Sequence, residues 1–398
     1  MVSPANRDPS RPAPVDGDAV QILDELVRLA VQERASDIHL EPKHDQMQVR
    51  LRVDGALADV QGIALAVYPQ VVSRIKVLAR MDIAERRLPQ DGQLALTVGN
   101  ERIHLRASTF PTTQGEKVVL RILAGHHYLH PFEKLGLDDE SQRKLRDHVA
   151  RPQGFLVTSG PTGAGKTSTL YAFLELVDTS EVNVVTLEDP IEVELYGITQ
   201  GQVNGRTGFT FATGLRSILR QDPDVILVGE MRDAETAGIA MQAALTGHLV
   251  MSTVHTSDTV ETIVRLVDLG VEPWIIANAL SAVLAQRLVR VVCRSCAELT
   301  TLDADFWDGD EVLVTAGSKV VRPKGCEQCM RTGYRGRTGI FEMLEIDDEL
   351  RELIKHKAAS RAYREIFARR RIKSLRRVGF EKAVAGITTL DEVRRVTT

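Results

Sequence analysis

The first part of the chain combines one helical hydrophobic pattern with several alternating ones. Near its start, apolar side chains recur at helical spacing and predict an amphipathic helix over 19–34. Apolar and polar residues then alternate over 47–53, and the Asp54-Gly55 pair that follows tolerates the positive φ of a hairpin turn. A further helix and three further strands are predicted at 68–81, 94–98, 103–108 and 117–123. The pattern indicates a small α+β domain with an antiparallel sheet over 19–124.

The pattern changes from Phe155 onward, where short runs of apolar residues alternate with helical stretches. These runs begin near 155, 184, 225 and 249. Strands that are apolar on both faces indicate a mostly parallel sheet covered by helices on each side. We therefore predict a second α/β domain over 137–398, largely helical beyond residue 333 and ending in a basic helical part over 345–398.

Two segments fit neither pattern. The first 18 residues are polar and contain four prolines, which predicts a disordered tail. They lack the basic end and apolar run of a secretory signal, so we expect a cytoplasmic protein. Residues 125–136 form the predicted linker. Its His126, His127 and His130 suggest a metal, but no fourth ligand is evident and a surface connector is the favoured interpretation.

Composition limits the class of protein. The 398 residues, 43% of them hydrophobic, supply cores for two or three domains and exclude a mostly disordered chain. No stretch approaches the roughly 20 apolar residues of a membrane-spanning helix. Charge is uneven, because residues 351–398 carry 14 Lys or Arg against 5 Asp or Glu. Such an end can meet phosphates or an anionic membrane, although solvated helix faces explain it equally simply.

Residues 160–167 carry the most specific motif, G-x-x-x-x-G-K-T, between an apolar strand and a helix. Glycines in such a loop turn backbone N–H groups toward phosphate oxygens, and the helix N-terminus favours negative charge. Lys166 is expected to reach the β- and γ-phosphates of ATP, and Thr167 to hold Mg²⁺. The candidate nucleotide-binding residues are Gly160, Pro161, Thr162, Gly163, Ala164, Gly165, Lys166, Thr167 and Ser168.

Polar residues also follow three of the other apolar runs. Glu188 and Glu230 each end a strand, and since carboxyl ends of parallel strands share one edge, both are expected near the phosphates. Either could be the general base, and the other would then organise Mg²⁺. His248 and His255 bracket a third run. They could sense the γ-phosphate or bridge subunits, although a lone histidine is more often structural.

All four cysteines lie in one short region. Cys293-x-x-Cys296 and Cys326-x-x-Cys329 are separated by 29 residues, a spacing that lets four thiolates converge on a tetrahedral metal. We predict a structural zinc element over 290–332, with an iron–sulfur centre or a redox pair as the alternatives.

With these residues in place, the chain from about residue 19 to 398 resembles the type II secretion and type IV pilus assembly ATPases. The matching motifs are ASDIHLEP at 35–42, GPTGAGKTST at 160–169, TLEDPIE at 186–192, RQDPDVILVGEMRD at 220–233 and TGHLVMSTVHT at 246–256. Ala164 and Ser168 replace the usual Ser and Thr, and both changes leave the backbone cradle intact. Long members carry an extra N-terminal docking domain, where this chain has its proline-rich tail.

The resemblance implies a PAS-like domain followed by a RecA-like ATPase domain, assembled as a homohexamer. It implies work on an inner-membrane platform protein, at the inner face of the cytoplasmic membrane. Arg106 and Arg121 match arginines that reach the γ-phosphate from the first domain. The cysteine pattern resembles assembly motors more than pilus-retraction motors.

Three other functions are compatible with parts of the sequence. One is a competence- or conjugation-type DNA traffic ATPase, and another is a nucleotide-gated adaptor without turnover. The intact Lys166, Glu188 and Glu230 speak against the adaptor. A nucleic-acid translocase is disfavoured because aromatic residues, at 5%, are too sparse for a base-stacking track.

Overall fold

The structure is a computed structural model, and the chain divides into two compact units, Met1–Gly125 and His126–Thr398. The structure describes residues 14–15, 17–123, 129–308 and 311–397. Residues 1–13 and 16 of the predicted tail lie outside the described residues. So does the part of the predicted linker that holds His126 and His127.

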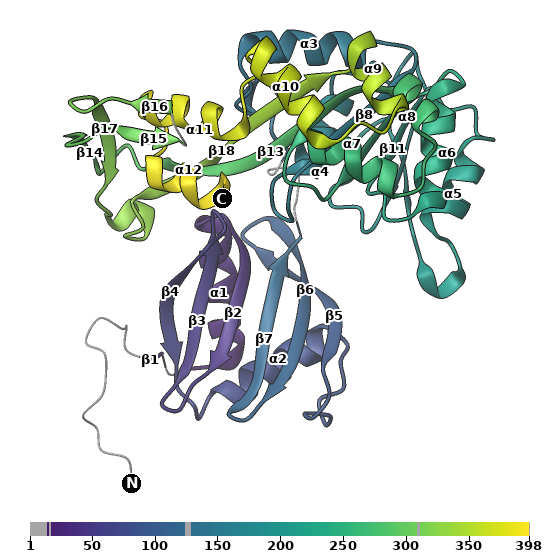
Figure 1. Ribbon diagram of the computed structural model, residues 1–398. Helices are drawn as coiled ribbons and strands as arrows, with labels where there is room; N and C mark the ends of the chain where they lie inside the picture. Colours follow the sequence, from purple (N-terminus) through teal and green to yellow (C-terminus); the bar gives the residue numbers. More distant parts are fainter. Residues whose placement is uncertain (1–13, 16, 124–128, 309–310, 398) are drawn as a thin grey trace. The chain divides into compact units, whose positions relative to one another are not determined.

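The first unit is an α+β domain built on one seven-stranded sheet. Its strands follow the spatial order β1-β4-β3-β2-β7-β6-β5, antiparallel except where β1 pairs with β4. Both helices lie on the same side of this sheet (Figure 1). The strands are β1 (Pro14–Val15), β2 (Ala35–Pro42), β3 (Met47–Val53), β4 (Ala56–Ile63), β5 (Gln90–Val98), β6 (Glu101–Thr112) and β7 (Gly115–Ile122), and the helices are α1 (Ala19–Gln32) and α2 (Tyr68–Leu78). The predicted fold class is confirmed, whereas the likeness to a PAS domain stays a prediction.

Local sequence explains much of this unit. Asp18 caps α1, and the apolar stripe of that helix is buried, with Leu23 and Val27 fully inaccessible. Asp54 and Gly55 both take positive φ in the β3–β4 hairpin, as predicted. Strand β2 was not predicted from hydrophobic alternation, because it buries charged side chains. One of them, Glu41, is accommodated by a 2.7 Å ion pair with Arg50 of β3.

The second unit contains the mostly parallel sheet that the apolar runs predicted. Six strands in the order β10-β9-β11-β12-β8-β13 are parallel, and β18 adds an antiparallel edge. The strands are β8 (Gly154–Ser159), β9 (Val184–Glu188), β10 (Thr199–Gln202), β11 (Val225–Val228), β12 (Leu249–Val254), β13 (Leu280–Val292) and β18 (Tyr334–Glu345). Small sheets pair β14 (Ala297–Thr301) with β17 (Lys319–Pro323), and β15 (Phe306–Asp308) with β16 (Glu311–Val314).

Helices flank this sheet and follow it to the C-terminus. They are α3 (Asp139–Val149), α4 (Lys166–Leu174), α5 (Phe211–Ile218), α6 (Ala234–Leu245), α7 (Thr259–Asp268), α8 (Pro273–Ala279), α9 (Asp348–Lys355), α10 (Ser360–Arg370), α11 (Leu375–Val384) and α12 (Leu390–Thr397). Short 3₁₀ turns are η2 (Phe132–Lys134), η3 (Gly205–Thr207) and η4 (Glu327–Cys329). Among the described residues, no helix is both long and apolar enough to cross a membrane.

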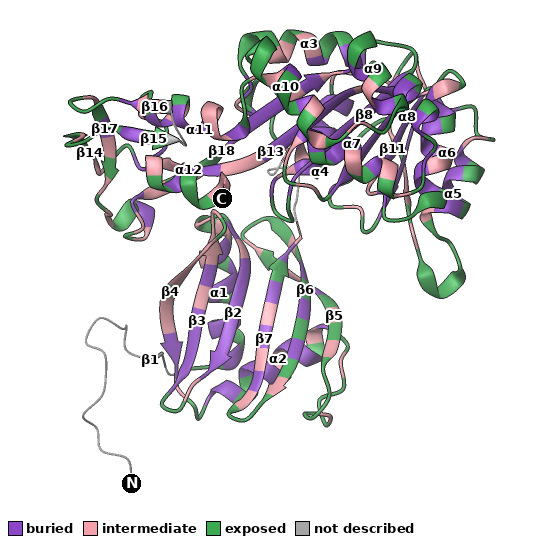
Figure 2. Cartoon of the chain, in the orientation of Figure 1, coloured by how far each residue is buried: buried purple, intermediate pink, exposed green. Residues whose placement is uncertain are grey.

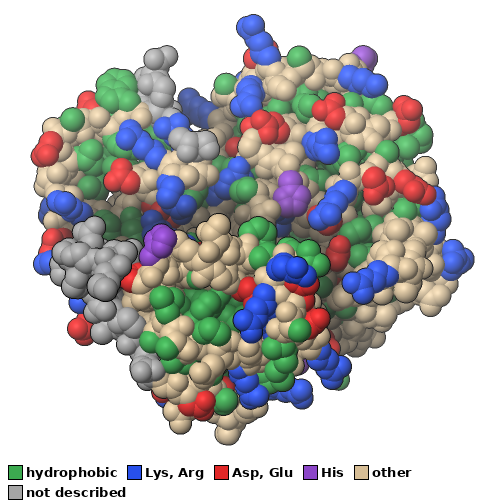
Figure 3. Space-filling view, turned by 90° about the horizontal axis from the view of Figure 1, so that it is seen from below, with side chains coloured by type: hydrophobic (Ala, Val, Ile, Leu, Met, Phe, Trp, Pro, Cys, Tyr) green, Lys and Arg blue, Asp and Glu red, His purple; other side chains and the backbone are tan. Residues whose placement is uncertain are grey.

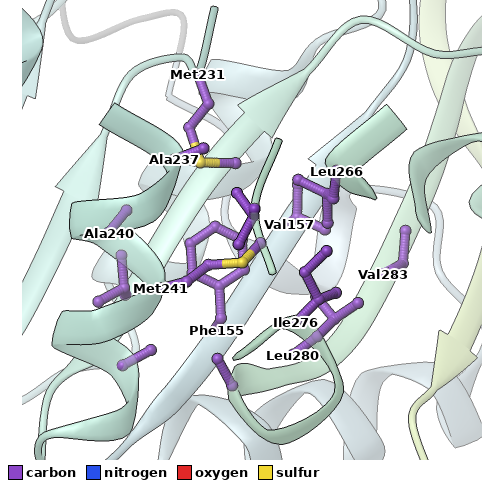
Figure 4. Packing of buried hydrophobic residues seen from close by; sticks show 14 of the residues in the cluster. Phe155, Val157, Met231, Ala237, Ala240, Met241, Leu266, Ile276, Leu280 and Val283 are labelled. Carbon is purple, nitrogen blue, oxygen red and sulfur yellow. The ribbon is translucent and has the colours of Figure 1, made fainter. Parts of the chain in front are cut away.

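The main core of the second unit fixes the strands that carry the predicted site. Phe155 and Val157 of β8 pack in one cluster with Met241 of α6 and Leu266 of α7 (Figure 4). Strands β8 and β11 are buried along their length (Figure 2). Close packing of this kind holds the ends of the strands in register, so the loops that leave them begin from fixed points.

The structure refines two expectations about this unit. The chain beyond residue 333 begins with a strand, because β18 occupies 334–345 and pairs with β13, and the predicted helices follow from Asp348 onward. The Arg- and Gly-rich start of β18 hides the alternation that would mark a strand. The described end of the predicted linker is anchored at one point: Phe132 is buried, with its ring centroid 5.9 Å from that of Phe173 in α4, whereas Pro131 and Glu133 on either side of it are exposed.

Candidate active site

The phosphate loop follows β8 directly and opens α4. Gly160, Gly163 and Gly165 all have positive φ, at 149°, 80° and 86°, which an L side chain rarely adopts. Gly165 is the N-cap residue, and Lys166 and Thr167 form the first turn of α4. The motif glycines therefore bend the chain so that the helix N-terminus, with its free N–H groups, faces the loop. This arrangement can bind the phosphates of a nucleotide.

Three of the predicted residues meet at the carboxyl edge of the sheet. Strand β12 lies between β8 and β11, so the residues that follow these three strands are neighbours. Lys166 Nζ lies 3.4 Å from His255 Nδ1, and His255 Nε2 lies 3.7 Å from Glu230 Oε2. Lys166 also donates to the carbonyls of Gly160 and Pro161, at 2.7 and 3.0 Å. A cation, an imidazole and a carboxylate are thus assembled beside the phosphate loop.

Burial sets the protonation of this group. Burial lowers the pKa of Lys166 to about 8, with Glu230 opposing the shift and Arg287 adding to it. Burial also lowers the pKa of His255, the nearby Lys166 charge adds to that, and Glu230 opposes it. At neutral pH, Lys166 is therefore charged and His255 is a neutral imidazole that can accept a proton or a hydrogen bond.

Glu188 and Glu230 have different surroundings, although the sequence made them equivalent. Glu188 is almost fully buried and accepts hydrogen bonds from the Tyr171 hydroxyl, Thr186 Oγ1 (2.6 Å) and Gln200 Nε2 (3.1 Å). Burial and the Glu188 charge raise the pKa of Tyr171, so its hydroxyl remains a donor. Glu230 is more exposed and ion-pairs with Arg232 at 2.6 Å. Glu188 is thus held in place by its donors, whereas Glu230 is the carboxylate next to Lys166.

His248 lies at the other edge of the sheet. It precedes β12, whose first residue, Leu249, pairs with Gly154 at the start of β8. Six residues of strand, roughly 20 Å, therefore separate it from the phosphate-loop edge where His255 lies. His248 Nδ1 lies 2.9 Å from the Ala243 carbonyl oxygen. Within one chain, the two predicted histidines are not brought together.

Arg106 and Arg121 belong to the first unit. They are direct cross-strand partners on β6 and β7, and both side chains are exposed. Arg121 Nε donates to Asp37 Oδ1 at 3.0 Å. Two adjacent guanidinium groups suit phosphate recognition, and their approach to the phosphate loop stays a prediction.

The four cysteines converge as predicted. Their sulfur atoms all lie within 4.8 Å of one another, with separations of 3.9 Å for Cys293–Cys326, 3.8 Å for Cys296–Cys329 and 3.7 Å for Cys326–Cys329. Zn–S bonds of about 2.3 Å give a tetrahedron with edges of about 3.8 Å. The backbone N–H groups of Cys326 and Gly333 donate to Cys329 Sγ at 3.2 Å, which would support a thiolate ligand. The set fits a closed structural Zn²⁺ site.

Two polar residues of β13 that were not predicted from the sequence also contact the site. Gln286 donates through Nε2 to the carbonyl of Ala164 in the phosphate loop at 2.7 Å. Arg287 donates to the carbonyls of Gln286 and Ser257, at 2.9 and 2.8 Å. The signal available in the sequence was a Gln-Arg pair that interrupts the apolar run from 280 to 292.

A phosphate loop at the carboxyl edge of a mostly parallel sheet, with the Glu230 carboxylate near its lysine, defines a P-loop nucleoside triphosphatase. Residues 15–395 match the family described as Type II/IV secretion system protein. The type II secretion system ATPase E of Vibrio cholerae is 45% identical over 387 residues, which cover 96% of this chain and 76% of that protein. The chain belongs to the type II/IV secretion system protein family and is an ATPase of that family, which uses ATP and Mg²⁺.

One further relative and one solved structure are similar to this chain. The type IV pilus assembly ATPase PilB of Thermus thermophilus is 43% identical over 387 residues, 96% of this chain and 44% of that protein. The solved structure of the ATPase DotB of Legionella pneumophila matches with a TM-score of 0.70 over 98% of this chain and 97% of that one. Its sequence identity is 22%, so this comparison supports the fold alone.

Proposed function

We propose that Lys166, His255 and Glu230 turn over MgATP at the phosphate loop and that the chain converts this turnover into mechanical work. In this proposal Lys166 neutralises the transferred phosphate, Thr167 holds Mg²⁺, and Glu230 orients the attacking water. Glu188 is a positioning acid, fixed by Tyr171. The observation that carries the proposal is the contact series from Lys166 through His255 to Glu230.

A steady-state ATPase assay tests these roles. Lys166→Ala and Glu230→Gln are each expected to lower kcat by about two orders of magnitude or more, because each removes a group that acts in the transition state. Glu235→Gln is the matched control, since Glu235 lies on α6 close to Glu230 in the sequence but pairs with the exposed Arg216. Near-normal turnover in Glu230→Gln would remove Glu230 from the mechanism.

For the machine that this ATPase drives, we propose assembly or export of pilin-like subunits by a homohexamer bound to an inner-membrane platform protein. The names of the relatives above support secretion and pilus assembly rather than DNA traffic. Direct attraction of the basic C-terminus to an anionic membrane is a weaker part of the proposal. Arg369 and Arg370 pair with Glu349, and Arg364 pairs with Asp258. On the face seen in Figure 3, basic and acidic side chains are interspersed.

Arg106 and Arg121 would serve this motor as a clamp on the γ-phosphate. If they grip that group, ATP favours a closed arrangement of the two units and its hydrolysis releases them. Arg106→Ala should then lower kcat at least tenfold while changing ADP affinity less than about threefold, since ADP lacks the phosphate that is gripped. His104→Ala on the same strand is the control. An equal loss of ADP affinity would contradict the clamp.

A further inference from the structure

Strand β13 reaches further than its parallel neighbour. It pairs with β8 up to Ala285, which is opposite Ser159, the last residue of β8. Beyond that point β8 turns into the phosphate loop, while β13 runs on to Val292. Residues 286–288 of β13 therefore lie alongside the phosphate loop.

Gln286 is the first residue of this extension and makes close contact with the loop. Its side chain is 1% exposed, and Nε2 donates to the Ala164 carbonyl at 2.7 Å. The backbone carbonyl of Gln286 packs against Gly160. A Cβ atom at position 160 would lie only 2.6 Å from that carbonyl oxygen. Leu288 lies two residues further along the same face of the strand and packs against Gly165. A Cβ atom placed on Gly165 would lie 3.4 Å from the Leu288 side chain, which is an ordinary van der Waals distance.

The hydrogen bond to Ala164 has a directional consequence. In a trans peptide the carbonyl and the following N–H point in opposite directions. The peptide between Ala164 and Gly165 therefore directs its N–H away from Gln286 when its carbonyl is directed toward Gln286. Gly165 has φ of 86° and caps α4, so this N–H belongs to the group of donors at the helix N-terminus that face a phosphate.

The chemistry of the position also points to a role beyond packing. Gln286 Oε1 is buried and has no hydrogen-bond partner among the described residues. Burying an amide oxygen in this way is unfavourable, and an apolar side chain of similar size would avoid the cost. The side-chain amide at this position therefore has a role beyond packing, which is to donate a hydrogen bond to the Ala164 carbonyl.

We propose that Gln286 is a positioning residue for phosphate binding: its amide fixes the Ala164–Gly165 peptide so that the Gly165 N–H faces the β-phosphate of the bound nucleotide. This inference rests on the proposed role of the phosphate loop. In this proposal, part of the nucleotide affinity depends on Gln286 of β13, which lies outside the phosphate-loop motif and does not itself touch the nucleotide.

The test compares nucleotide binding and stability in matched variants. Gln286→Met keeps the size of the side chain and removes the donor, and Gln286→Glu places a carboxylate against a carbonyl. We expect Gln286→Met to weaken ADP binding about 10-fold or more, Gln286→Glu to weaken it further, and AMP binding to change less than about twofold, because AMP has no β-phosphate. Isothermal titration calorimetry measures both affinities, with AMP competed against ADP.

Leu288→Ala is the control on the same strand face. It removes packing against Gly165 and should lower the melting temperature without separating ADP from AMP, whereas Gln286→Met should bind ADP poorly at a near-wild-type melting temperature. An ADP affinity within twofold of wild type in Gln286→Met would overturn the inference, as would an equal loss for AMP. Failure of the wild-type chain to bind ADP would instead overturn the proposed function.

Discussion

Strand β13 connects two sites of opposite character. At Gln286 it passes the phosphate loop, and after Val292 it leads into Cys293 of the tetracysteine element. The cysteine site is closed, because its four sulfur atoms have each other as neighbours and Cys293 and Cys329 are buried. The nucleotide site is open, and His255, beside Lys166, keeps half of its side-chain surface exposed. A site that stabilises the fold can be complete within the chain, whereas a site for chemistry must leave positions for its ligand.

The largest effect should come from opening the closed site. Cys326→Ser is expected to reduce bound zinc from about one per chain to near zero and to lower the melting temperature by about 10 °C, because structural metal binding is coupled to folding. Plasma mass spectrometry and calorimetry measure the two quantities. ADP affinity should stay within about threefold.

Two results would contradict this contrast between a closed cysteine site and an open nucleotide site. Protein kept reduced and free of chelator that contains no zinc would show that the cysteines are not a metal site. A collapse of ADP affinity in Cys326→Ser would show that β13 transmits the state of one site to the other.

A smaller effect is expected at Glu188, the active-site acid that, like the closed cysteine site, is buried and held in place by neighbouring groups. Glu188→Gln replaces one accepting oxygen by an NH₂ group that faces the Tyr171, Thr186 or Gln200 donors. The cost should be about 1–3 kcal/mol of unfolding free energy, or roughly 5 °C in melting temperature. Glu230→Gln should leave the melting temperature nearly unchanged. Equal stability losses in the two variants would erase the distinction between a positioning acid and a reacting one.

The smallest effect concerns pH and the open site. Burial lowers the pKa of Lys166 to about 8, so the free protein loses this charge as the pH rises above 8. A bound diphosphate favours the charged form, so binding takes up a proton and ADP affinity should fall as pH rises, by at most about tenfold per pH unit. Lys166→Arg stays charged and should show a flat profile. A flat wild-type profile between pH 8 and 9.5 would contradict the lowered pKa.

Short-range patterns explain which parts of this protein were predictable. The phosphate loop and each Cys-x-x-Cys pair place their functional groups within a few residues of one another in the sequence. The loop glycines, the N-cap and the cysteine spacing all act locally, so the sequence alone reveals them. Strands β8, β9, β11 and β12 were also predictable, because strands buried on both faces are apolar throughout. Strand β18 was not, since its partner β13 lies far away in the sequence and its own first residues are polar.

The sequence by itself determined the class of chemistry: a phosphate loop, acids at strand ends, and four thiols at metal spacing. Only the tertiary structure decided which of these residues act together. It placed His255 beside Lys166, distinguished Glu230 from the hydrogen-bonded Glu188, and brought Gln286 to a loop more than a hundred residues earlier in the sequence. The physical reason is that strand order and register bring distant residues to one edge of a sheet, and no local preference of the backbone encodes that order.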